Sequence, residues 1–184
     1  MKTDPKYTWI NSLKGLPKTI SLGMDFLGVA EVVGKGSNKT IIGWRDKLNQ
    51  AGVKIEGYSN DDIPWCGLFA AFIAYLRMKV AGEVVKLPLW ARSWAKYGVK
   101  ADVPSLGDVL VFERPGGGGH VGFYIAEDSL TYHVLGGNQS NKVCITRVAK
   151  SRLIAARRPP YKNKPAAVKP YKVAAGGTLS TNEA

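Results

Sequence analysis

The chain has 184 residues, 45% of them hydrophobic and 22% charged, a composition typical of one globular domain and incompatible with disorder throughout. Its 26 Lys and Arg residues against 14 Asp and Glu residues give a net charge of +12, which indicates an anionic partner such as nucleic acid, a membrane surface or a bacterial envelope. Two cysteines exclude a disulfide scaffold, and the most apolar run, residues 63–76, is too short to cross a membrane.

Helical periodicity in the first half of the chain predicts four helices, at residues 19–33, 38–51, 67–81 and 89–97. The third of these is apolar on nearly every face, which is typical of a helix buried at the centre of a domain. Residues 1–18 precede the first helix and are assigned to an N-terminal extension.

The hydrophobic period then changes to two, which predicts five short strands, at residues 107–112, 121–126, 130–135, 143–148 and 153–157. The connections between them are short and rich in turn residues, which favours an antiparallel meander. Helices followed by an antiparallel sheet make the expected fold class α+β, with the domain at residues 19–158.

The composition changes after Arg158, where the chain becomes rich in Pro, Lys and Ala and poor in large aliphatic residues. Such a segment buries little apolar surface against its chain entropy, so residues 159–184 are expected to form a flexible basic tail. Much of the basic excess lies from Lys150 onward, where eight basic residues face the single acid Glu183.

Cys66 stands at the start of the buried helix, in the string DDIPWCGLF. The N-terminus of a helix offers unpaired N–H groups and a positive dipole, both of which favour a thiolate. Cys66 is therefore a candidate nucleophile, and the alternative is a small buried apolar residue.

His120 follows four glycines at the mouth of a predicted strand, and Asn138 follows the next strand in the string GGNQSN. Adjacent antiparallel strands bring the start of one beside the end of the other, so Asn138 is expected near His120. A helix-start cysteine, a histidine and an asparagine in this order are compatible with a Cys-His-Asn triad.

The strings DDIPWCGLFAAFIAY, LPLWARSWAKYG, PSLGDVLVF, GHVGFYIAED, VLGGNQSN and RLIAARRP follow one another along the chain. Together they resemble the papain-like bacterial cell-wall hydrolases of the NlpC-type and CHAP superfamily. The resemblance is strongest to a phage and prophage branch with PWC, GDVLVF, GHVGFY and LGGNQ. It implies a papain-like fold, in which N-terminal helices pack on an antiparallel sheet of about five strands.

The resemblance implies a cysteine endopeptidase that cuts the stem or cross-link peptide of peptidoglycan, as a phage lysin does. Cys66 would attack the amide carbonyl, His120 would carry the proton, and Asn138 would orient His120. NlpC-type members commonly have a histidine in the third role, so His133 is the alternative, although GGNQ favours Asn138. An N-acetylmuramoyl-L-alanine amidase or an acyl transferase with the same triad stays open, as does a non-catalytic basic module that binds the envelope or nucleic acid.

Side chains near Cys66 and on the fourth helix are candidates for binding the substrate. Trp65 and Trp94 would contact glycan or peptide, and Asp62 would meet an amine of the stem peptide. The Cys and His residues of the chain lack the paired spacing of a zinc site, so neither a metal nor a cofactor is expected.

The distribution of basic residues predicts the partners of the protein. The basic segment contains no nucleic-acid-binding motif, so the tail is expected to bind anionic envelope polymers, and the protein is expected to be a monomer. The first 17 residues lack the apolar core of a signal peptide. Synthesis in the (host) bacterial cytoplasm and action in the periplasm or cell wall are therefore expected.

Overall fold

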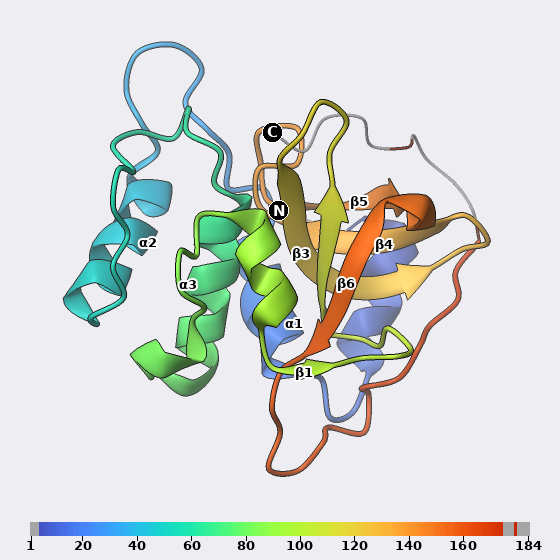
Figure 1. Cartoon of the computed structure of the whole chain (residues 1–184). Helices are drawn as coiled ribbons and strands as arrows, with labels where there is room; N and C mark the ends of the chain where they lie inside the picture. The colour runs from blue at the N-terminus through green and yellow to red at the C-terminus, as the bar shows by residue number, and fades with distance from the viewer. Residues whose placement is uncertain (1–3, 175–178, 180–184) are drawn as a thin grey trace.

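Helices pack against one face of an antiparallel sheet in the computed structural model, which describes residues 4–174 and 179 (Figure 1). This arrangement confirms the predicted α+β class. In the described part of the chain, no helix is long and apolar enough to cross a membrane. The helical elements are the α-helices α1 (Lys18–Met24), α2 (Lys39–Gln50) and α3 (Cys66–Met78), and the 3₁₀ helices η1 (Pro5–Ser12), η2 (Ala81–Glu83), η3 (Ala91–Lys96) and η4 (Lys150–Arg152).

The first helix is shorter than its apolar pattern predicts, because the chain leaves the helical conformation after Met24. Gly28 adopts a φ of 83°, which is a left-handed conformation that favours glycine. Its N–H donates to the carbonyl of Val143, and Ala30 forms a β-bridge with Lys142. The loop that follows α1 is therefore held beside the start of the last-but-one strand.

The sheet has six strands in the order β1-β6-β2-β3-β4-β5, and every neighbouring pair is antiparallel. Strands β2 to β5 form the predicted meander, but β6 returns to the opposite side and pairs with β2. Only the short η4 joins β5 to β6, so the sheet must curl strongly for these two strands to be connected. The strands are β1 (Val99–Lys100), β2 (Val109–Glu113), β3 (Gly119–Glu127), β4 (Thr131–Gly136), β5 (Cys144–Ala149) and β6 (Leu153–Arg158).

The curled sheet separates two apolar cores. The larger core lies between the helices and the outer face of the sheet, and includes Trp44 and Phe69. The smaller core lies on the opposite face and includes Phe112, Tyr124 and Val134. Side chains alternate along a strand between the two faces, so Phe123 of β3 enters the larger core and Tyr124 the smaller one.

The N-terminal extension packs on the domain through Tyr7 and Ile10 of η1, which are both buried. Residues 1–3 of this extension lie outside the described residues.

The segment after Arg158 corrects the expectation of a flexible tail as far as residue 173. Ala167 and Val168 are buried, the ring of Tyr171 lies 4.8 Å from that of Trp9, and Val173 donates to the carbonyl of Glu127 at 3.0 Å. A few apolar side chains and these backbone hydrogen bonds fix the segment, although its overall composition is polar. Residues 175–178 and 180–184 of the predicted tail lie outside the described residues.

Candidate active site

Cys66 is the first residue of α3 and is only 4% exposed. The next residue, Gly67, leaves room for the backbone of another segment, because a Cβ there would lie 2.6 Å from the carbonyl oxygen of Leu89 and also against that of Pro88. Residues 88–89 therefore pass directly over the first turn of the helix, and they cover one side of the cysteine.

The surroundings of the Cys66 thiol act on its pKa in opposite directions. Burial raises the pKa of the thiol, whereas hydrogen bonds from the backbone N–H groups of Val121 and Gly67 and the positive charge of Arg114 lower it. Because Val121 follows His120 directly, its N–H places the thiol beside the backbone of His120. The thiol of Cys66 therefore lies close to the strand that carries His120.

His120 lies in β3 with its side chain fully buried beside the ring of Phe112. Its Nε2 lies 2.9 Å from Oε1 of Gln139. The amide nitrogen of Gln139 donates to the carbonyl oxygens of Val134, at 3.1 Å, and Cys144, at 2.6 Å. These two acceptors fix the orientation of the amide, so Oε1 faces the imidazole and accepts a hydrogen bond from Nε2–H. The neutral imidazole then has its basic lone pair at Nδ1.

The side chain that contacts Nε2 of His120 is thus that of Gln139. The sequence predicted its neighbour, Asn138, as the residue that orients His120. Asn138 is buried in the turn after β4 and has a φ of 55°. The string GGNQ contains two amide side chains, and strand periodicity alone did not distinguish between them. The glycine at position 136 is a further sequence feature that fits the His120–Gln139 pair. A Cβ at this position would lie 2.8 Å from Oε1 of Gln139 and 3.2 Å from Nε2 of His120.

His133 belongs to a separate buried network on β4. Its Nδ1 lies 2.7 Å from the hydroxyl of Tyr7, and its Nε2 lies 3.1 Å from Oδ2 of Asp128. Burial lowers the pKa of His133 and favours its neutral form. Burial alone would raise the pKa of Asp128, but hydrogen bonds, first among them those from Thr131 and the N–H of Leu130, hold it well below its usual range.

The four Cys and His side chains considered for zinc do not form one cluster. Among the residues that the structure describes, no group of three or more His, Cys, Asp or Glu side chains is arranged to hold a metal ion. Cys144 instead contacts Gln139, with its thiol 3.4 Å from the Gln139 carbonyl oxygen.

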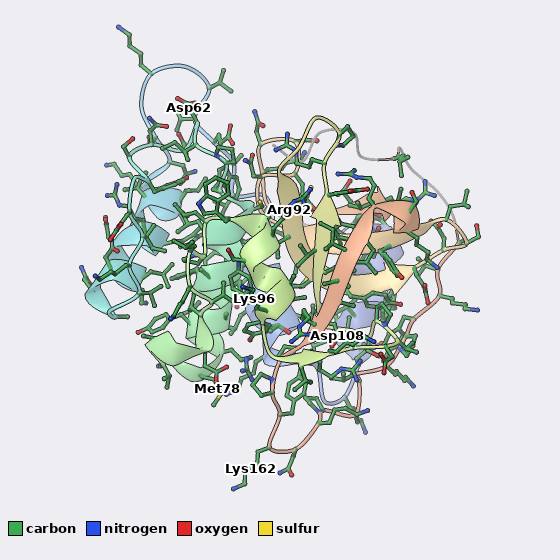
Figure 2. All side chains as sticks on the ribbon, in the orientation of Figure 1. Asp62, Met78, Arg92, Lys96, Asp108 and Lys162 are labelled. Atoms are coloured by element: carbon green, nitrogen blue, oxygen red, sulfur yellow. The ribbon has the colours of Figure 1, made fainter. Side chains whose placement is uncertain are left out.

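The three candidate substrate-binding residues differ in their exposure. Trp65 is fully buried, and its indole N–H donates to Oε1 of Glu31 at 2.7 Å. Burial and the nearby carboxylates of Asp61 and Asp62 raise the pKa of Glu31. Asp62 lies on the loop before α3 and is exposed to solvent (Figure 2).

Trp94 is completely buried, with its indole N–H donating to the carbonyl of Pro88 at 3.0 Å, so it has no exposed surface for a ligand. The predicted α-helix would place Trp90 and Trp94 on one face. In the 3₁₀ helix η3, with three residues per turn, residues four apart are separated by about 120°. Trp94 accordingly points into the core, while Trp90 is 70% exposed.

Comparison with known families agrees with this geometry. Residues 57–138 match the family model described as CHAP domain, a segment that includes Cys66, His120 and Asn138 and ends one residue before Gln139. No curated protein matches the chain. The match over residues 57–138 confirms the resemblance to CHAP-type cell-wall hydrolases.

Proposed function

We propose that this protein is a cysteine hydrolase that cuts an amide bond in the peptide part of peptidoglycan. The match of residues 57–138 to the CHAP domain model supports a peptidoglycan hydrolase of the amidase and peptidase type. The observation that carries the cysteine mechanism is the position of Cys66 at the start of α3, where the backbone N–H groups of Gly67 and of Val121, the residue after His120, lower the pKa of its thiol. A buried thiol, an imidazole and an amide acceptor behind the imidazole are the parts of a thiol hydrolase.

The reaction begins when Nδ1 of His120 takes the proton of the Cys66 thiol. The sulfur then forms a bond to the carbon of the substrate amide, and the carbonyl electron pair moves onto oxygen. When this intermediate collapses, the C–N bond breaks, and the amine leaves with the proton that Nδ1 returns. The product at this stage is a thioester of Cys66. A water molecule, deprotonated by His120, then attacks the thioester, and the thiol and a free carboxylic acid are released.

Gln139 is the residue that we assign to the orientation of His120. Its Oε1 accepts from Nε2, which keeps the basic lone pair at Nδ1 and stabilises the imidazolium once the proton has moved. The predicted Asn138 is the preceding residue in the chain, and a variant of it serves as the control for Gln139. His133 instead forms hydrogen bonds with Tyr7 and Asp128.

Acidic side chains near the start of α3 are proposed to bind an amine of the stem peptide. Asp62 is exposed, and Glu31 is half-buried beside Trp65. In this arrangement the buried Trp65 positions the carboxylate of Glu31. The carboxylates of Glu31 and Asp62 then bind the positively charged amine of the stem peptide. The bond that is cut is proposed to lie in the stem or cross-link peptide, with the N-acetylmuramoyl-L-alanine amide as the alternative.

The proposed setting is the bacterial cell wall, where the protein acts as a phage lysin. Exposed basic side chains on the C-terminal segment are proposed to bind anionic envelope polymers. Figure 2 places Lys162 at the opposite end of the molecule from Asp62, so this contact would leave the acidic side of the site accessible. The lysines concerned are Lys162, Lys164, Lys169 and Lys172.

Digestion of purified sacculi with the wild type and with Cys66→Ala tests the function, with new termini identified by mass spectrometry. New amine and carboxyl termini from the wild type alone are expected, and their identity names the bond. Equal release by both proteins would exclude the cysteine mechanism. Binding to sacculi without any cleavage would instead support a non-catalytic basic module.

A further inference from the structure

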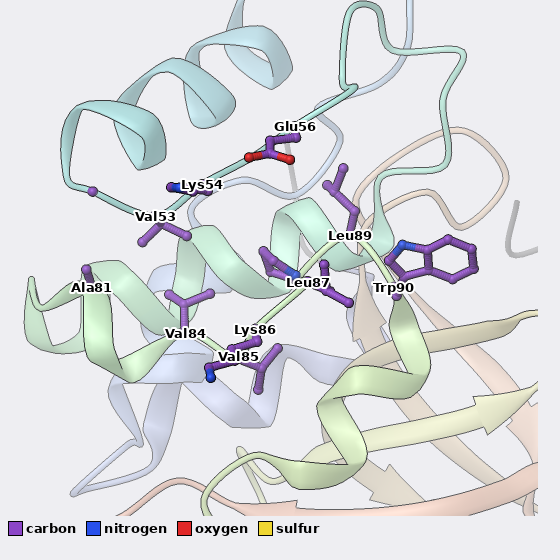
Figure 3. A pocket seen from close by; sticks show the side chains of 12 residues that line it. Val53, Lys54, Glu56, Ala81, Val84, Val85, Lys86, Leu87, Leu89 and Trp90 are labelled. Atoms are coloured by element: carbon purple, nitrogen blue, oxygen red, sulfur yellow. The ribbon is translucent and has the colours of Figure 1, made fainter.

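A cavity of about 380 Å³ lies between the segment after α2 and the segment that precedes η3 (Figure 3). This volume is within the range of small-molecule sites, which measure roughly 300–1,000 Å³. Val53 and Val84 form one end, and Leu89 and Trp90 form the other. Apolar side chains thus line most of the cavity, and it is not part of the Cys66–His120 arrangement described above.

The Trp90 end of the cavity lies close to the residue that follows Cys66 and to the residues that precede His120. The backbone of Leu89 lies over Gly67, directly after Cys66. On the other side, Nε of Arg92 donates to the carbonyl of Gly118 at 2.7 Å, and a Cβ at Gly119, directly before His120, would lie 3.4 Å from that of Ala91. Residues 88–92 therefore connect the two sides of the candidate active site, and the exposed Trp90 stands in the middle of this segment.

Trp90 presents a large aromatic surface to solvent at this position. Its side chain and that of Leu87 are each 70% exposed, although both line the cavity. The exposed side chains of Lys54, Glu56 and Lys86 also line it and supply hydrogen-bond donors and an acceptor. The indole stands at one end of the cavity next to Leu89, and the polar side chains lie along the cavity from there (Figure 3), which suits an extended ligand with an apolar face and polar substituents.

We infer that this cavity binds a hexosamine ring of the peptidoglycan glycan strand, with one face of the sugar on the indole of Trp90. This inference rests on the proposed function, because it concerns the uncut part of the same substrate. The face of an indole is electron-rich and attracts the C–H groups on the flat side of a pyranose ring. The parts of the glycan strand that extend from this ring along the cavity meet the polar side chains of Lys54, Glu56 and Lys86.

Calorimetry with a peptide-free N-acetylglucosamine tetramer tests the binding directly. The wild type is expected to bind the tetramer, and Trp90→Ala to weaken binding about tenfold or more, since buried aromatic anchors commonly contribute this much. Trp90→Phe keeps an aromatic face and should retain most of the affinity. Leu130→Ala is the matched control, because Leu130 is also exposed (74%) but lies in the turn between β3 and β4. Absence of saturable binding by the wild type, or equal binding by Trp90→Ala, would overturn the inference.

Kinetics then distinguish a sugar from other occupants. Trp90→Ala should raise KM about tenfold for glycan-linked substrate and leave hydrolysis of glycan-free cross-linked peptide unchanged. An equal loss on both substrates would make the cavity a peptide subsite and overturn the inference. So would a wild-type dimer in sedimentation that Trp90→Ala dissociates, because the occupant would then be a second copy of the chain. Oligosaccharide binding through Trp90 in a protein without Cys66-dependent hydrolysis would contradict the proposed function alone.

Discussion

Nε2 of His120 lies 2.9 Å from Oε1 of Gln139, and the amide nitrogen of the same glutamine is held by the carbonyl groups of Val134 and Cys144. The two ends of one side chain therefore link the imidazole to the backbone of β4 and β5. Rotation of the amide would bring its N–H groups toward Nε2 and would leave the two carbonyl groups without these hydrogen bonds. The surrounding backbone thereby favours the tautomer of His120 that carries its proton on Nε2.

Gln139→Ala is expected to lower kcat by about ten- to a thousandfold, because Nε2 loses the acceptor that orients the ring. Gln139→Glu keeps an oxygen at this position, and its negative charge stabilises the imidazolium. The acidic limb of the pH profile should therefore move to higher pH in Gln139→Glu. The measurement is kcat/KM against pH, with melting temperatures to correct for stability.

Asn138→Gly serves as the control for this prediction, because glycine accepts the φ of 55° that alanine would adopt only with strain. A smaller loss of kcat is expected in Asn138→Gly than in Gln139→Ala. The reverse order, at equal folded fraction, would transfer the orienting role to Asn138.

Cys66→Ala is expected to lower the rate of sacculus hydrolysis by about a thousandfold or more, because no other side chain supplies the sulfur that forms the thioester. The substitution removes one small buried atom, so the melting temperature should change little. Release of soluble fragments is measured beside a thermal melt. Unchanged hydrolysis by the alanine variant is the result that would contradict the mechanism.

Iodoacetamide should inactivate the protein, and EDTA should leave its activity intact, because a thiolate nucleophile does not require a Lewis acid. Both treatments are assayed on the same sacculi, and the alkylated residue is identified by peptide mapping. Protection of Cys66 from alkylation by soluble muropeptides would place the substrate at the thiol. Inactivation by EDTA together with resistance to iodoacetamide would instead favour a metal-dependent hydrolase.

The sequence was sufficient for those parts of the structure that depend on local pattern. The helix at 38–51 corresponds to α2, because Asn38 caps it by accepting from the N–H of Thr40 and its apolar residues share one face. Each predicted strand has a counterpart in the sheet, because side chains alternate between two buried faces along the central strands. The order of these elements along the chain also led to the prediction that Cys66 and His120 act together, and the variants described above test it.

Other features depended on contacts between distant residues and were not predictable from local pattern. The pairing of β6 with β2 requires the curl of the whole sheet. The different directions of Trp90 and Trp94 depend on whether residues 91–96 form an α-helix or a 3₁₀ helix, and both conformations fit the same apolar spacing. Similarly, the choice between Asn138 and Gln139 depends on the backbone conformation of one turn.

His133→Ala is expected to lower the stability by about 2–4 kcal/mol, because it leaves a cavity and removes hydrogen-bond partners from Tyr7 and Asp128. Activity per folded molecule should stay unchanged, since this network is separate from Cys66. Urea unfolding gives the stability, and turnover is normalised to the folded fraction. A large fall in kcat at unchanged stability would give His133 the third role at the active site.

The same network predicts how stability depends on pH. The pKa of His133 in the folded protein is lowered by burial, so the unfolded chain binds more protons as the pH falls below about 6.5. The contribution of neutral His133 to the free energy of unfolding is complete above a pH of about 6.5. It is lost as the pH falls toward the pKa of His133 in the folded protein. The stability of His133→Ala should vary less than that of the wild type over this range. Parallel curves for the two proteins would show that His133 does not contribute to the acid sensitivity.

Deletion of residues 160–184 is expected to lower the melting temperature by about 5–10 °C, because it removes buried contacts as well as basic charge. Ala167 and Val168 are buried, and the ring of Tyr171 packs on that of Trp9. The backbone carbonyl of Tyr171 also accepts a hydrogen bond from the hydroxyl of Tyr124. Tyr171→Ala should reproduce part of the loss, whereas Lys162→Ala should not, because Lys162 is exposed.

Salt dependence separates the packing role of this segment from its charge. Replacing Lys162, Lys164, Lys169 and Lys172 together by glutamine should preserve the melting temperature, because their side chains are exposed. Binding to sacculi should weaken at low salt and become less sensitive to added salt, since screening acts on the charges that are removed. An unchanged melting temperature after deletion would mean that the packed contacts contribute nothing to stability. Unchanged binding after the glutamine substitutions would mean that the lysines do not hold the protein on its polymer.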